Sequence, residues 1–575
     1  MKVLGINDGH NAAACLYEDG HVVAAIQEER LRRVKNWSGM PTQAIRTVLE
    51  MTATSPDQLD FVAMNGHSAA FAKTRDQLME EYRTINDFGV TIRRSGRRAV
   101  RRALRPTPLY EVYRERRTLA RVRELIEMGV SPDKIVCVDH HTAHASAAYY
   151  GWGKFEDDIL ILTCDGAGDG LCATVNIGRN GRIERIHEIE QAASIGNIYA
   201  MVTFLMGMVP LEHEYKLMGL APYADPKGAN QVFRELEALI RFSSRNPLGW
   251  ERSAGCPETY CSYRFFRDLL ERKRFDWIAG GLQKFTEVVL AQWVTSCLKE
   301  TGIRRLALGG GIFMNVKANK LIMELPTVQE LFIYPSCGDE TNAMGAAYWV
   351  YAEKAGTAKM TPLRDLYWGP QFSDDHVEDA LGSFPFHKAV KYERVTPVEP
   401  RVARLLADGK VVARFKGREE FGARALGNRS ILANPSDPGV IRVINEAIKS
   451  RDFWMPFAPA ILEERSSDYL VNPKGIRAPH MILSFDTTER RNEIRAAIHP
   501  FDGTARPQEV PSGWNREYHI LLKEFERWTG VGGVLNTSFN LHGFPIVSRP
   551  EDALEVFDRS GLTHLAIGNW LVEKR

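Results

Sequence analysis

The sequence predicts an α/β protein in which a duplicated β-sheet is followed by a second α/β domain. Two observations lead to this prediction. Residues 2–29 and 159–189 each contain an apolar strand, an Asp-Gly turn, a second strand, a hairpin turn with Gly and a third strand. Around residues 355–375 Pro and Gly interrupt the pattern. We therefore expect one domain over residues 1–358 and another over residues 359–575.

The repeat aligns Asp8-Gly9 with Asp165-Gly166 and the turn Glu18-Asp19-Gly20 with Arg179-Asn180-Gly181. Two such units in tandem resemble the duplicated sheet of the superfamily that holds actin, sugar kinases and heat-shock chaperone ATPases. That resemblance implies two Asp-Gly turns facing each other across a nucleotide cleft. Gly lets backbone N–H groups approach a phosphate, while Asp can hold a metal or a water. A chance repeat of common hairpins is the alternative.

Composition limits the class of protein. The chain has 575 residues, is 44% hydrophobic and carries a net charge of +2, so nothing in its overall charge favours nucleic acid or an anionic membrane as partner. No apolar stretch is long enough to span a membrane, and the N-terminal residues lack a signal-peptide pattern. The eight cysteines form no CxxC pair, which argues against zinc ribbons and a disulfide framework. We expect a cytoplasmic protein.

Residues 93–123 contain twelve arginines, and Pro106 and Pro108 divide them into two predicted helices. A contact with nucleic acid is one interpretation. A solvated helical insertion near an anionic substrate cleft is the one we favour, because few aromatic residues accompany the arginines.

The densest set of metal-ligand residues begins at His140. On a helix, His140 and His144 are four residues apart and point the same way, a spacing that suits two ligands of one metal. Asp165 and Asp339 could supply two further ligands, and a mixed His/carboxylate site suits iron, manganese or zinc. The alternative is a helix N-terminus with Asp139 as its cap and histidines that pack as polar surface.

Further residues are candidates for binding anions. A strand ends in Gly309-Gly310-Gly311 with Asn315 at the expected start of a helix, a junction that can bind a nucleotide or simply form a packing turn. Lys216 could neutralise a phosphate. In the second domain, Arg418, Arg424 and Arg429 lie among glycines in residues 415–430, which suggests recognition of phosphate or carboxylate, although a surface loop rich in arginine is the alternative.

Together these motifs resemble the O-carbamoyltransferase family, which includes nodulation-factor, cephamycin, novobiocin and tobramycin-type enzymes. The match covers nearly the whole chain. It includes His10 with the following Ala run, Glu28-Glu29-Arg30, the His140/His144 pair, Met218–Tyr223, Gly309–Asn319, Gly422–Ser430, Lys449-Ser450-Arg451 and Asn536–Asn540. Neither a GxxxxGK[ST] motif nor a GxSxG motif occurs in the sequence.

The resemblance implies two modules. The first is similar to the tRNA threonylcarbamoyl-transferase branch of the actin-like superfamily, and the second to YrdC, whose K-x-R…S-x-N signature falls on Lys449, Arg451, Ser538 and Asn540. It implies that the second module cleaves carbamoyl phosphate and joins carbamate to AMP with release of pyrophosphate. The first module then transfers the carbamoyl group to a hydroxyl. The implied metal is iron, and Mg²⁺ would accompany ATP.

His10 could take the proton of the acceptor hydroxyl, since the pKa of histidine is close to neutrality. Many relatives have His-Asp before the small residues, whereas this chain has Asn11, so Asp8 is the acid that remains nearby. The sequence thus predicts an ATP-dependent O-carbamoyltransferase of natural-product biosynthesis, with carbamoyl phosphate, ATP and a hydroxylated small molecule as substrates. A homo-oligomer is possible, but the sequence does not determine the oligomeric state.

Three alternatives stay open at this point. A hydrogenase-maturation carbamoyltransferase would also carry CxxC zinc motifs and an acylphosphatase-like segment, which are not evident. A tRNA-modifying threonylcarbamoyl enzyme would use the arginines of residues 93–123. A non-catalytic nucleotide-binding module of the actin type would not need Lys449, Arg451, Ser538 and Asn540.

Overall fold

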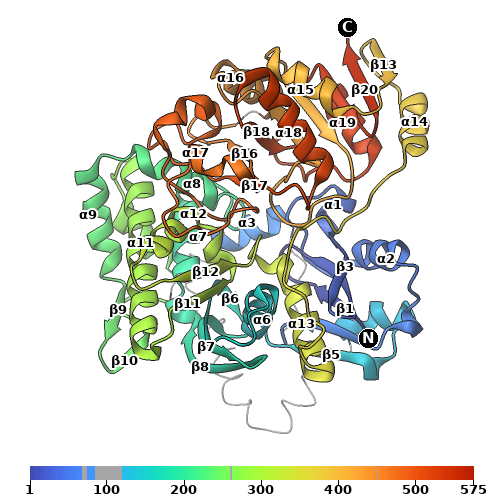
Figure 1. Ribbon diagram of the computed structural model, residues 1–575. Coiled ribbons are helices and arrows are strands. Elements are labelled where there is room, and N and C mark those ends of the chain that lie inside the picture. The colour runs from blue at the N-terminus through green and yellow to red at the C-terminus, as the bar shows by residue number, and fades with distance from the viewer. Residues whose placement is uncertain (68–73, 85–119, 259–261, 450) are drawn as a thin grey trace. The chain divides into compact units, whose positions relative to one another are not determined.

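The structure is a computed structural model that describes residues 1–67, 74–84, 120–258, 262–449 and 451–575 (Figure 1). The chain divides into two compact units. The first comprises Met1–Ala24 and Asn36–Leu363, and the second Ala25–Lys35 and Arg364–Arg575. Most of the arginine-rich insertion predicted over residues 93–123 lies outside the described residues; residues 120–127 are helical.

Two five-stranded sheets organise the first unit. The first has the order β3-β2-β1-β4-β5 and the second the order β12-β11-β6-β7-β8. Their strands are β1 (Lys2–Asn7), β2 (Ala13–Glu18), β3 (His21–Gln27), β4 (Phe61–Asn65), β5 (Ile135–Val138), β6 (Ile159–Gly168), β7 (Leu171–Arg179), β8 (Arg182–Glu190), β11 (Arg305–Gly309) and β12 (Glu330–Ile333). β3 ends in residues that cluster with the second unit.

The two sheets share one connectivity. In each sheet, three consecutive strands pair antiparallel. The first of these three also pairs in parallel with a fourth strand, which in turn pairs in parallel with a fifth. Both predicted hairpin turns have two central residues with positive φ, at Asp19-Gly20 and at Asn180-Gly181, which matches the twist of the flanking strands. The duplicated actin-like sheet predicted from the repeat is therefore confirmed.

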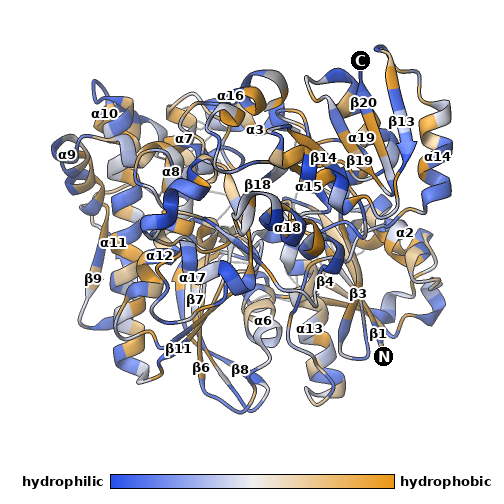
Figure 2. Cartoon of the chain, turned by 45° about the horizontal axis from the view of Figure 1, so that its top comes forward, coloured by the Kyte–Doolittle hydropathy of each residue, from blue (hydrophilic) through white to orange (hydrophobic). Residues whose placement is uncertain are grey.

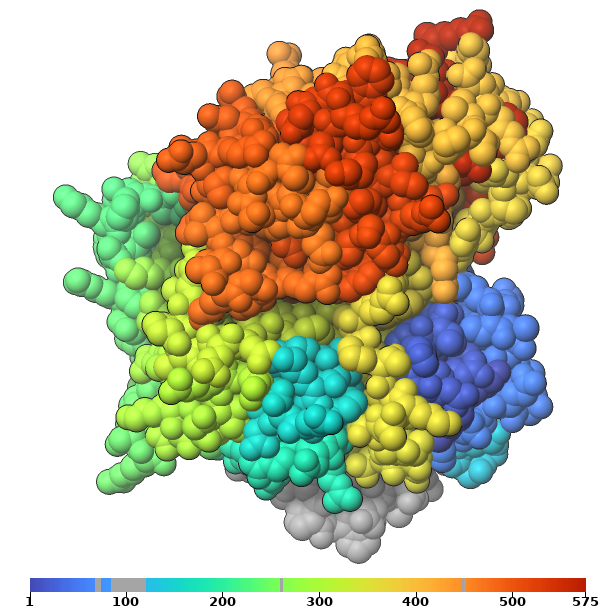
Figure 3. Space-filling view, viewed as in Figure 1, coloured from blue at the N-terminus to red at the C-terminus, as the bar shows by residue number. Residues whose placement is uncertain are grey.

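Helices cover both sheets of this unit. They are α2 (Thr42–Met51), α3 (Arg75–Thr84), α6 (His140–Trp152), α7 (Ile195–Leu205), α8 (Glu214–Leu220), α9 (Pro226–Glu237), α10 (Tyr263–Leu270), α11 (Phe275–Thr301), α12 (Val316–Glu324) and α13 (Asn342–Ala355), with a hairpin of β9 (Ile240–Ser243) and β10 (Asn246–Arg252). α6 and α13 lie side by side, and both reach the surface that Figure 3 shows. The strands carry mostly hydrophobic residues and form the core (Figure 2).

The second unit contains one eight-stranded mixed sheet of order β13-β20-β19-β14-β15-β18-β16-β17. Its strands are β13 (Val390–Arg394), β14 (Val412–Phe415), β15 (Arg429–Ala433), β16 (Ala458–Leu462), β17 (Gln508–Val510), β18 (Gly533–Ser538), β19 (His564–Ile567) and β20 (Trp570–Lys574). Its helices are α1 (Glu28–Arg32), α14 (Asp374–Ser383), α15 (Glu399–Ala407), α16 (Gly439–Ile444), α17 (Ser466–Tyr469), α18 (Arg516–Thr529) and α19 (Pro550–Arg559). The α/β fold class predicted for this part of the chain is confirmed.

Strand directions in this sheet bring distant residues to one edge. β15 and β16 both pair antiparallel with β18, and β17 pairs parallel with β16. The starts of β15, β16 and β17 therefore lie at the same edge as the end of β18. Among the described helices of both units, none is long and apolar enough to cross a membrane.

Candidate metal centre and anion site

Four side chains of the first unit converge at one point. His140 and His144 come from the first turns of α6, Asp165 from β6, and Asp339 from the turn before α13. One ligand atom of each lies within 4.8 Å of the others. Asp139 caps α6 by accepting a hydrogen bond from the backbone N–H of Thr142, so the helix begins where both imidazoles can face the carboxylates.

The distances in this cluster suit one metal ion. The Nε2 atom of His140 lies 3.0 Å from Asp165 Oδ2 and 3.6 Å from Asp339 Oδ1. The Nε2 atom of His144 lies 3.5 Å from each of the same two oxygens. A metal about 2.0–2.2 Å from its N and O ligands sets neighbouring ligand atoms roughly 2.8–3.6 Å apart. The four histidine–carboxylate distances fall in this range, and all four ligand atoms lie within 4.8 Å of one another, so these side chains are suited to hold one divalent cation.

The electrostatics of the cluster favour positive charge at its centre. Burial lowers the pKa of His140, but Asp339 and Asp165 outweigh it and raise that pKa to about 9. The pKa of His144 is also raised, since its bonds to the two carboxylates outweigh burial. Burial raises the pKa of Asp165, yet the two histidines bring it well below its usual value. A bound cation would replace the protons that the carboxylates hold on the imidazoles.

Amide side chains surround the cluster. Asn65 Nδ2 lies 3.4 Å from His140 Nδ1 and donates to Asn7 Oδ1 at 2.9 Å. Asn342 Nδ2 lies 3.1 Å from His144 Nε2. Asn65 and Asn342 were not predicted from the sequence. No motif marks them, because they meet the histidines only through sheet pairing and helix packing.

The loop after β1 lies beside this cluster. Asn11 Nδ2 donates to Glu340 Oε2 at 3.4 Å, and Glu340 follows the ligand Asp339 in sequence. Asp8 accepts two hydrogen bonds from the guanidinium of Arg121, at 2.6 and 2.5 Å, so this carboxylate is already paired. His10 lies in the same loop and is half-buried. Within the described ranges its imidazole has no hydrogen-bond partner, which leaves it available to a ligand.

The predicted triple glycine packs against the elements that carry the ligands. A Cβ on Gly309 would meet the carbonyl oxygen of His144 at 2.7 Å. Gly310 has φ +104, and a Cβ there would collide with the carbonyl of Cys164. A Cβ on Gly311 would meet Asp165 Oδ1 at 2.8 Å. These glycines therefore permit the close approach of β11 to the metal-ligand residues, whatever else they bind.

Two other predicted binding residues lie elsewhere in this unit. Asn315 caps α12 and forms a reciprocal pair of amide hydrogen bonds with Gln283, at 2.9 Å each, so its side chain has a structural role. Lys216 is half-buried in α8.

In the second unit, two of the predicted arginines bind main-chain carbonyls. Arg418 donates to the carbonyls of Trp368 and Gly369 at 2.6 and 3.3 Å. Arg429 is fully buried, stacks on Phe415 and donates to four carbonyls, those of Pro370, Lys416, Gly417 and Asn428. Both side chains stabilise the loop between β14 and β15. A sequence motif cannot distinguish this role from recognition of a ligand.

Three arginines gather at the edge of the sheet where β15, β16 and β17 begin. Arg424 precedes β15, Arg451 precedes β16, and Arg506 precedes β17. Burial, and then repulsion from Arg424 and Arg451, bring the pKa of Arg506 well below its usual value. Within the part of the chain that the structure describes, Arg506 has no salt bridge. Arg506 was not predicted from the sequence, because it stands in no motif and joins the other two arginines only through the strand order.

The end of β18 reaches the same edge with Ser538 and Asn540. Ser538 Oγ donates to Asn540 Oδ1 at 2.7 Å, and Asn540 Nδ2 donates to the carbonyl of Phe544 at 2.6 Å. Arg451 lies 3.4 Å from the hydroxyl of Thr537. Lys449 ends the π-helical turn Asn445–Lys449, but its side chain lies outside the described part. Cationic and hydroxyl groups at one edge are suited to a phosphate or carbamate.

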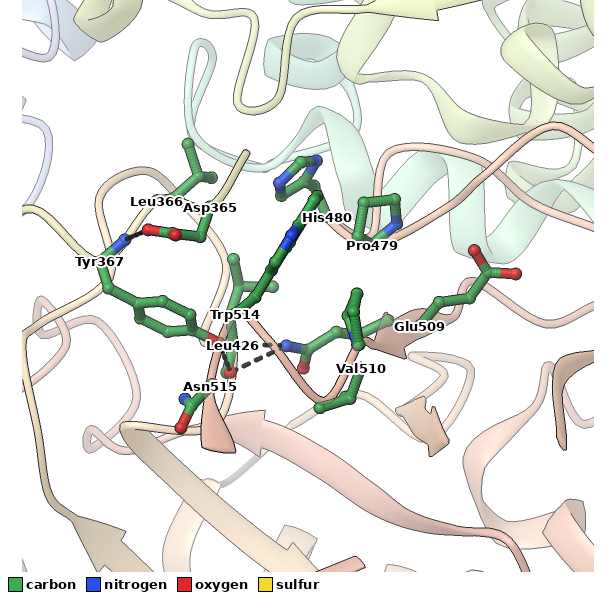
Figure 4. Close-up of a pocket in the computed structure, with 12 residues that line it drawn as sticks. Asp365, Leu366, Tyr367, Leu426, Pro479, His480, Glu509, Val510, Trp514 and Asn515 are labelled. Atoms are coloured by element: carbon green, nitrogen blue, oxygen red, sulfur yellow. Dashed lines mark hydrogen bonds between the residues drawn. The ribbon is translucent and has the colours of Figure 1, made fainter. Parts of the chain in front are cut away.

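A small pocket in the second unit is lined by Tyr367, Leu426 and His480, among other residues (Figure 4). Its wall includes the carbonyl of Leu426, which accepts hydrogen bonds from Tyr367 Oη at 2.7 Å and Gln508 Nε2 at 2.8 Å. With about 10 Å³ of internal space, the pocket has room for about one water. A space of this size does not offer a substrate site.

The duplicated sheet, the candidate metal centre and the cationic edge describe a two-unit α/β protein with one candidate site for a cation and one for an anion. Residues 2–348 match the family model "Carbamoyltransferase N-terminus", and residues 403–574 match "Carbamoyltransferase C-terminus". The chain belongs to the carbamoyltransferase family and is an enzyme that transfers a carbamoyl group.

Curated relatives agree with this family. Nodulation protein NolNO of Sinorhizobium fredii is 30% identical, over 98% of this chain and 79% of that protein. Nodulation protein NolO of Bradyrhizobium diazoefficiens is 32% identical, over 76% of this chain and 79% of that protein. Among solved structures, full-length HypF in its phosphate- and nucleotide-bound form matches 62% of this chain and 56% of that chain, at 13% identity and a TM-score of 0.32.

Proposed function

We propose that this carbamoyltransferase is ATP-dependent, takes its carbamoyl group from carbamoyl phosphate, and transfers it to a hydroxyl of a small metabolite. The observation that carries the proposal is the opposite charge of the two candidate sites, a carboxylate-rich centre in the first unit and an arginine-rich edge in the second. Domains 1–358 and 359–575 would each perform one half of the reaction, the second as a YrdC-like module.

The second unit would form the adenylate. Carbamoyl phosphate is cleaved with water to carbamate and phosphate, and a carbamate oxygen then attacks the α-phosphorus of ATP and releases pyrophosphate. Every species at this site is an anion, so Arg424, Arg451, Arg506 and Lys449 would offset the charge that accumulates at the reacting phosphorus. Ser538 and Asn540 would hydrogen-bond to carbamate or phosphate oxygens. Mg²⁺ would accompany ATP.

Arg418 and Arg429 would act indirectly in this step. Since both donate to main-chain carbonyls, we assign them to shaping the loop of Arg424 and not to direct contact with the substrate.

The first unit would transfer the carbamoyl group. The acceptor oxygen attacks the carbonyl carbon of the adenylate, AMP leaves, and His10 takes the proton of the attacking hydroxyl. Asp8, held by Arg121, would shape the loop of His10 and not act as the base itself. A divalent ion held by His140, His144, Asp165 and Asp339, for which we propose Fe²⁺, would polarise the carbonyl as a Lewis acid.

The nucleotide end of the adenylate would lie along the three glycines at the end of β11 and directly after it. Gly309, Gly310 and Gly311 leave main-chain groups open to close approach, and Lys216 would offset phosphate charge. Asn315 would support this region through its pair with Gln283. The proposed acceptor is a hydroxylated product of secondary metabolism, and nucleic acid is not proposed as a substrate.

Pyrophosphate release tests the proposal. Purified protein loaded with Fe²⁺ receives ATP with or without carbamoyl phosphate, and then a panel of hydroxylated acceptors. Release that requires carbamoyl phosphate supports the adenylate step, and stimulation by one class of acceptor identifies its substrate class. Absence of release under all conditions would contradict the ATP-dependent mechanism.

A further inference from the structure

The motif Glu28-Glu29-Arg30 has no part in the chemistry proposed above. It begins α1, within the segment Ala25–Lys35 that clusters with the second unit although both flanking parts of the chain belong to the first. The inference drawn from this segment rests on the proposed function of the second unit. It concerns how the arginine-rich edge is held.

Gly422 is fixed at both of its main-chain groups by this segment. Its N–H donates to Gln27 Oε1 at 3.1 Å, and its carbonyl accepts a hydrogen bond from the guanidinium of Arg30 at 2.6 Å. Gly422 has φ +99, a conformation that only Gly adopts readily, and stands two residues before Arg424. The backbone conformation at Gly422 therefore determines the position of the Arg424 side chain.

The side chains that make these contacts are buried from water. Arg30 is 1% exposed and donates to Glu419 Oε1 at 3.0 Å, while the second oxygen of Glu419 accepts a hydrogen bond from Ser548 Oγ at 2.5 Å. Gln27 is 3% exposed. Because water cannot replace a partner at such sites, loss of either side chain leaves a buried polar group without a bond.

The same segment also holds the chain that follows Asn540. Arg33 donates to the carbonyls of Pro545 and Ile546 at 3.4 and 3.1 Å and lies 3.4 Å from Asp552. Asn540 itself donates to the carbonyl of Phe544, one residue before Pro545. The segment thus contacts both loops that carry the candidate anion ligands.

We propose that Gln27 and Arg30 are positioning residues of the second unit's anion site, which they complete by fixing Gly422 so that Arg424 lies beside Arg451 and Arg506. Arg33 fixes the loop after Asn540 in the same way. The N-terminal segment thereby makes the anion site of the second unit dependent on residues that lie hundreds of positions earlier in the sequence.

The test uses the full chain and inorganic pyrophosphate as the probe. Gln27→Met keeps the size of the side chain but removes the acceptor for the Gly422 N–H, whereas Gln27→Glu keeps an acceptor. Calorimetry measures the Kd of pyrophosphate, and carbamoyl-phosphate-dependent exchange of pyrophosphate into ATP measures KM and kcat. Arg30→Lys, which keeps one donor, is the second variant, and Val34→Ala, at an exposed position of the same segment, is the matched control.

We expect Gln27→Met to raise the Kd of pyrophosphate and the KM of carbamoyl phosphate about tenfold, with kcat changed little. Gln27→Glu and Val34→Ala should stay within about twofold of wild type, and Arg30→Lys should lie between. Wild-type affinity in Gln27→Met, with its melting temperature intact, would overturn the inference. So would an equal loss in Val34→Ala, which would indicate a general effect on stability.

The two proposals fail in different ways. Wild-type protein that binds pyrophosphate but shows no exchange would contradict the adenylate step alone, while the binding series would still decide the role of Gln27 and Arg30.

Discussion

His140 and His144 lie between two carboxylates in the first unit, whereas Arg506 in the second lies against two further arginines. In the first cluster opposite charges stabilise one another before any ligand binds, and the pKa of His140 rises to about 9 even though burial lowers it. In the second, like charges are held together by the sheet, and the pKa of Arg506 falls. The first arrangement suits a cation and the second an anion.

The same contrast extends to the support of each site. The metal-ligand residues come from helix α6 and from strand and helix ends close to it. The arginines come from loops, and those loops are fixed by buried side chains such as Arg30 and Arg429. A substitution in one unit should therefore change one half of the reaction and spare the other.

The largest effect is expected at the metal centre. His144→Ala removes a ligand and should lower carbamoyl transfer at least about 100-fold, because the Lewis acid is lost, while pyrophosphate release persists. Metal content by mass spectrometry and the two partial reactions are the measurements. His141→Gln, which changes the neighbouring histidine outside the ligand set, should retain the metal. Loss of pyrophosphate release in His144→Ala would contradict the division between the units.

Arg451→Ala should give the reverse pattern. It removes a charged donor from the edge of the sheet beside Thr537, and pyrophosphate release should fall about 100-fold while metal content stays at the wild-type level. Transfer from chemically supplied carbamoyl adenylate should also be retained. A variant that loses metal as well would show that the two sites are not independent.

Two smaller effects are expected from a substitution of Arg506, one on stability and the other on affinity for pyrophosphate. Arg506→Met removes a repelled charge, so the free protein should melt about 2–4 °C higher, while the affinity for pyrophosphate should fall about tenfold. Thermal denaturation with and without pyrophosphate measures both effects, since a ligand stabilises only the protein that binds it. Arg495→Met, at an exposed position, is the control. A lower melting temperature without ligand would contradict the repulsion.

The sequence predicted the parts of this molecule that local pattern encodes. The Asp-Gly repeat predicted the duplicated sheet, and the i, i+4 spacing predicted that His140 and His144 point the same way. The assigned roles of the site residues remain predictions.

Long-range features escaped the sequence for physical reasons. Arg506 joins Arg424 only because β15, β16 and β17 run in the same direction, and no spacing reveals that. Residue type likewise cannot show that Arg429 donates to main-chain carbonyls or that Asn315 pairs with Gln283. These side chains have the chemistry of ligand-binding residues but form their bonds within the chain.

The last expected effect is a pH dependence of stability, in which two buried histidines differ. His480 Nε2 donates a hydrogen bond to the carbonyl of Arg364, 2.9 Å away, and the ring stacks on Trp514. Burial, and then Arg477, lower its pKa from 6.5 to about 4, opposite to the shift of His140. In the unfolded chain this histidine therefore binds its proton first as the pH falls. Its contribution to stability is complete above about pH 6.5 and is lost as the pH falls towards 4, by about 3 kcal/mol at most.

His480→Gln should remove this dependence, because glutamine keeps a polar contact but has no proton to bind in this range. The melting temperature of the variant minus that of wild type should therefore rise as the pH is lowered from 7 to 4.5, as measured by fluorescence-detected thermal unfolding. His376→Gln, at a half-exposed histidine, should follow the wild-type curve. A difference that stays constant with pH would mean that the pKa of His480 is close to its usual value. The second unit would then leave the pKa of its buried histidine unchanged, unlike the first unit.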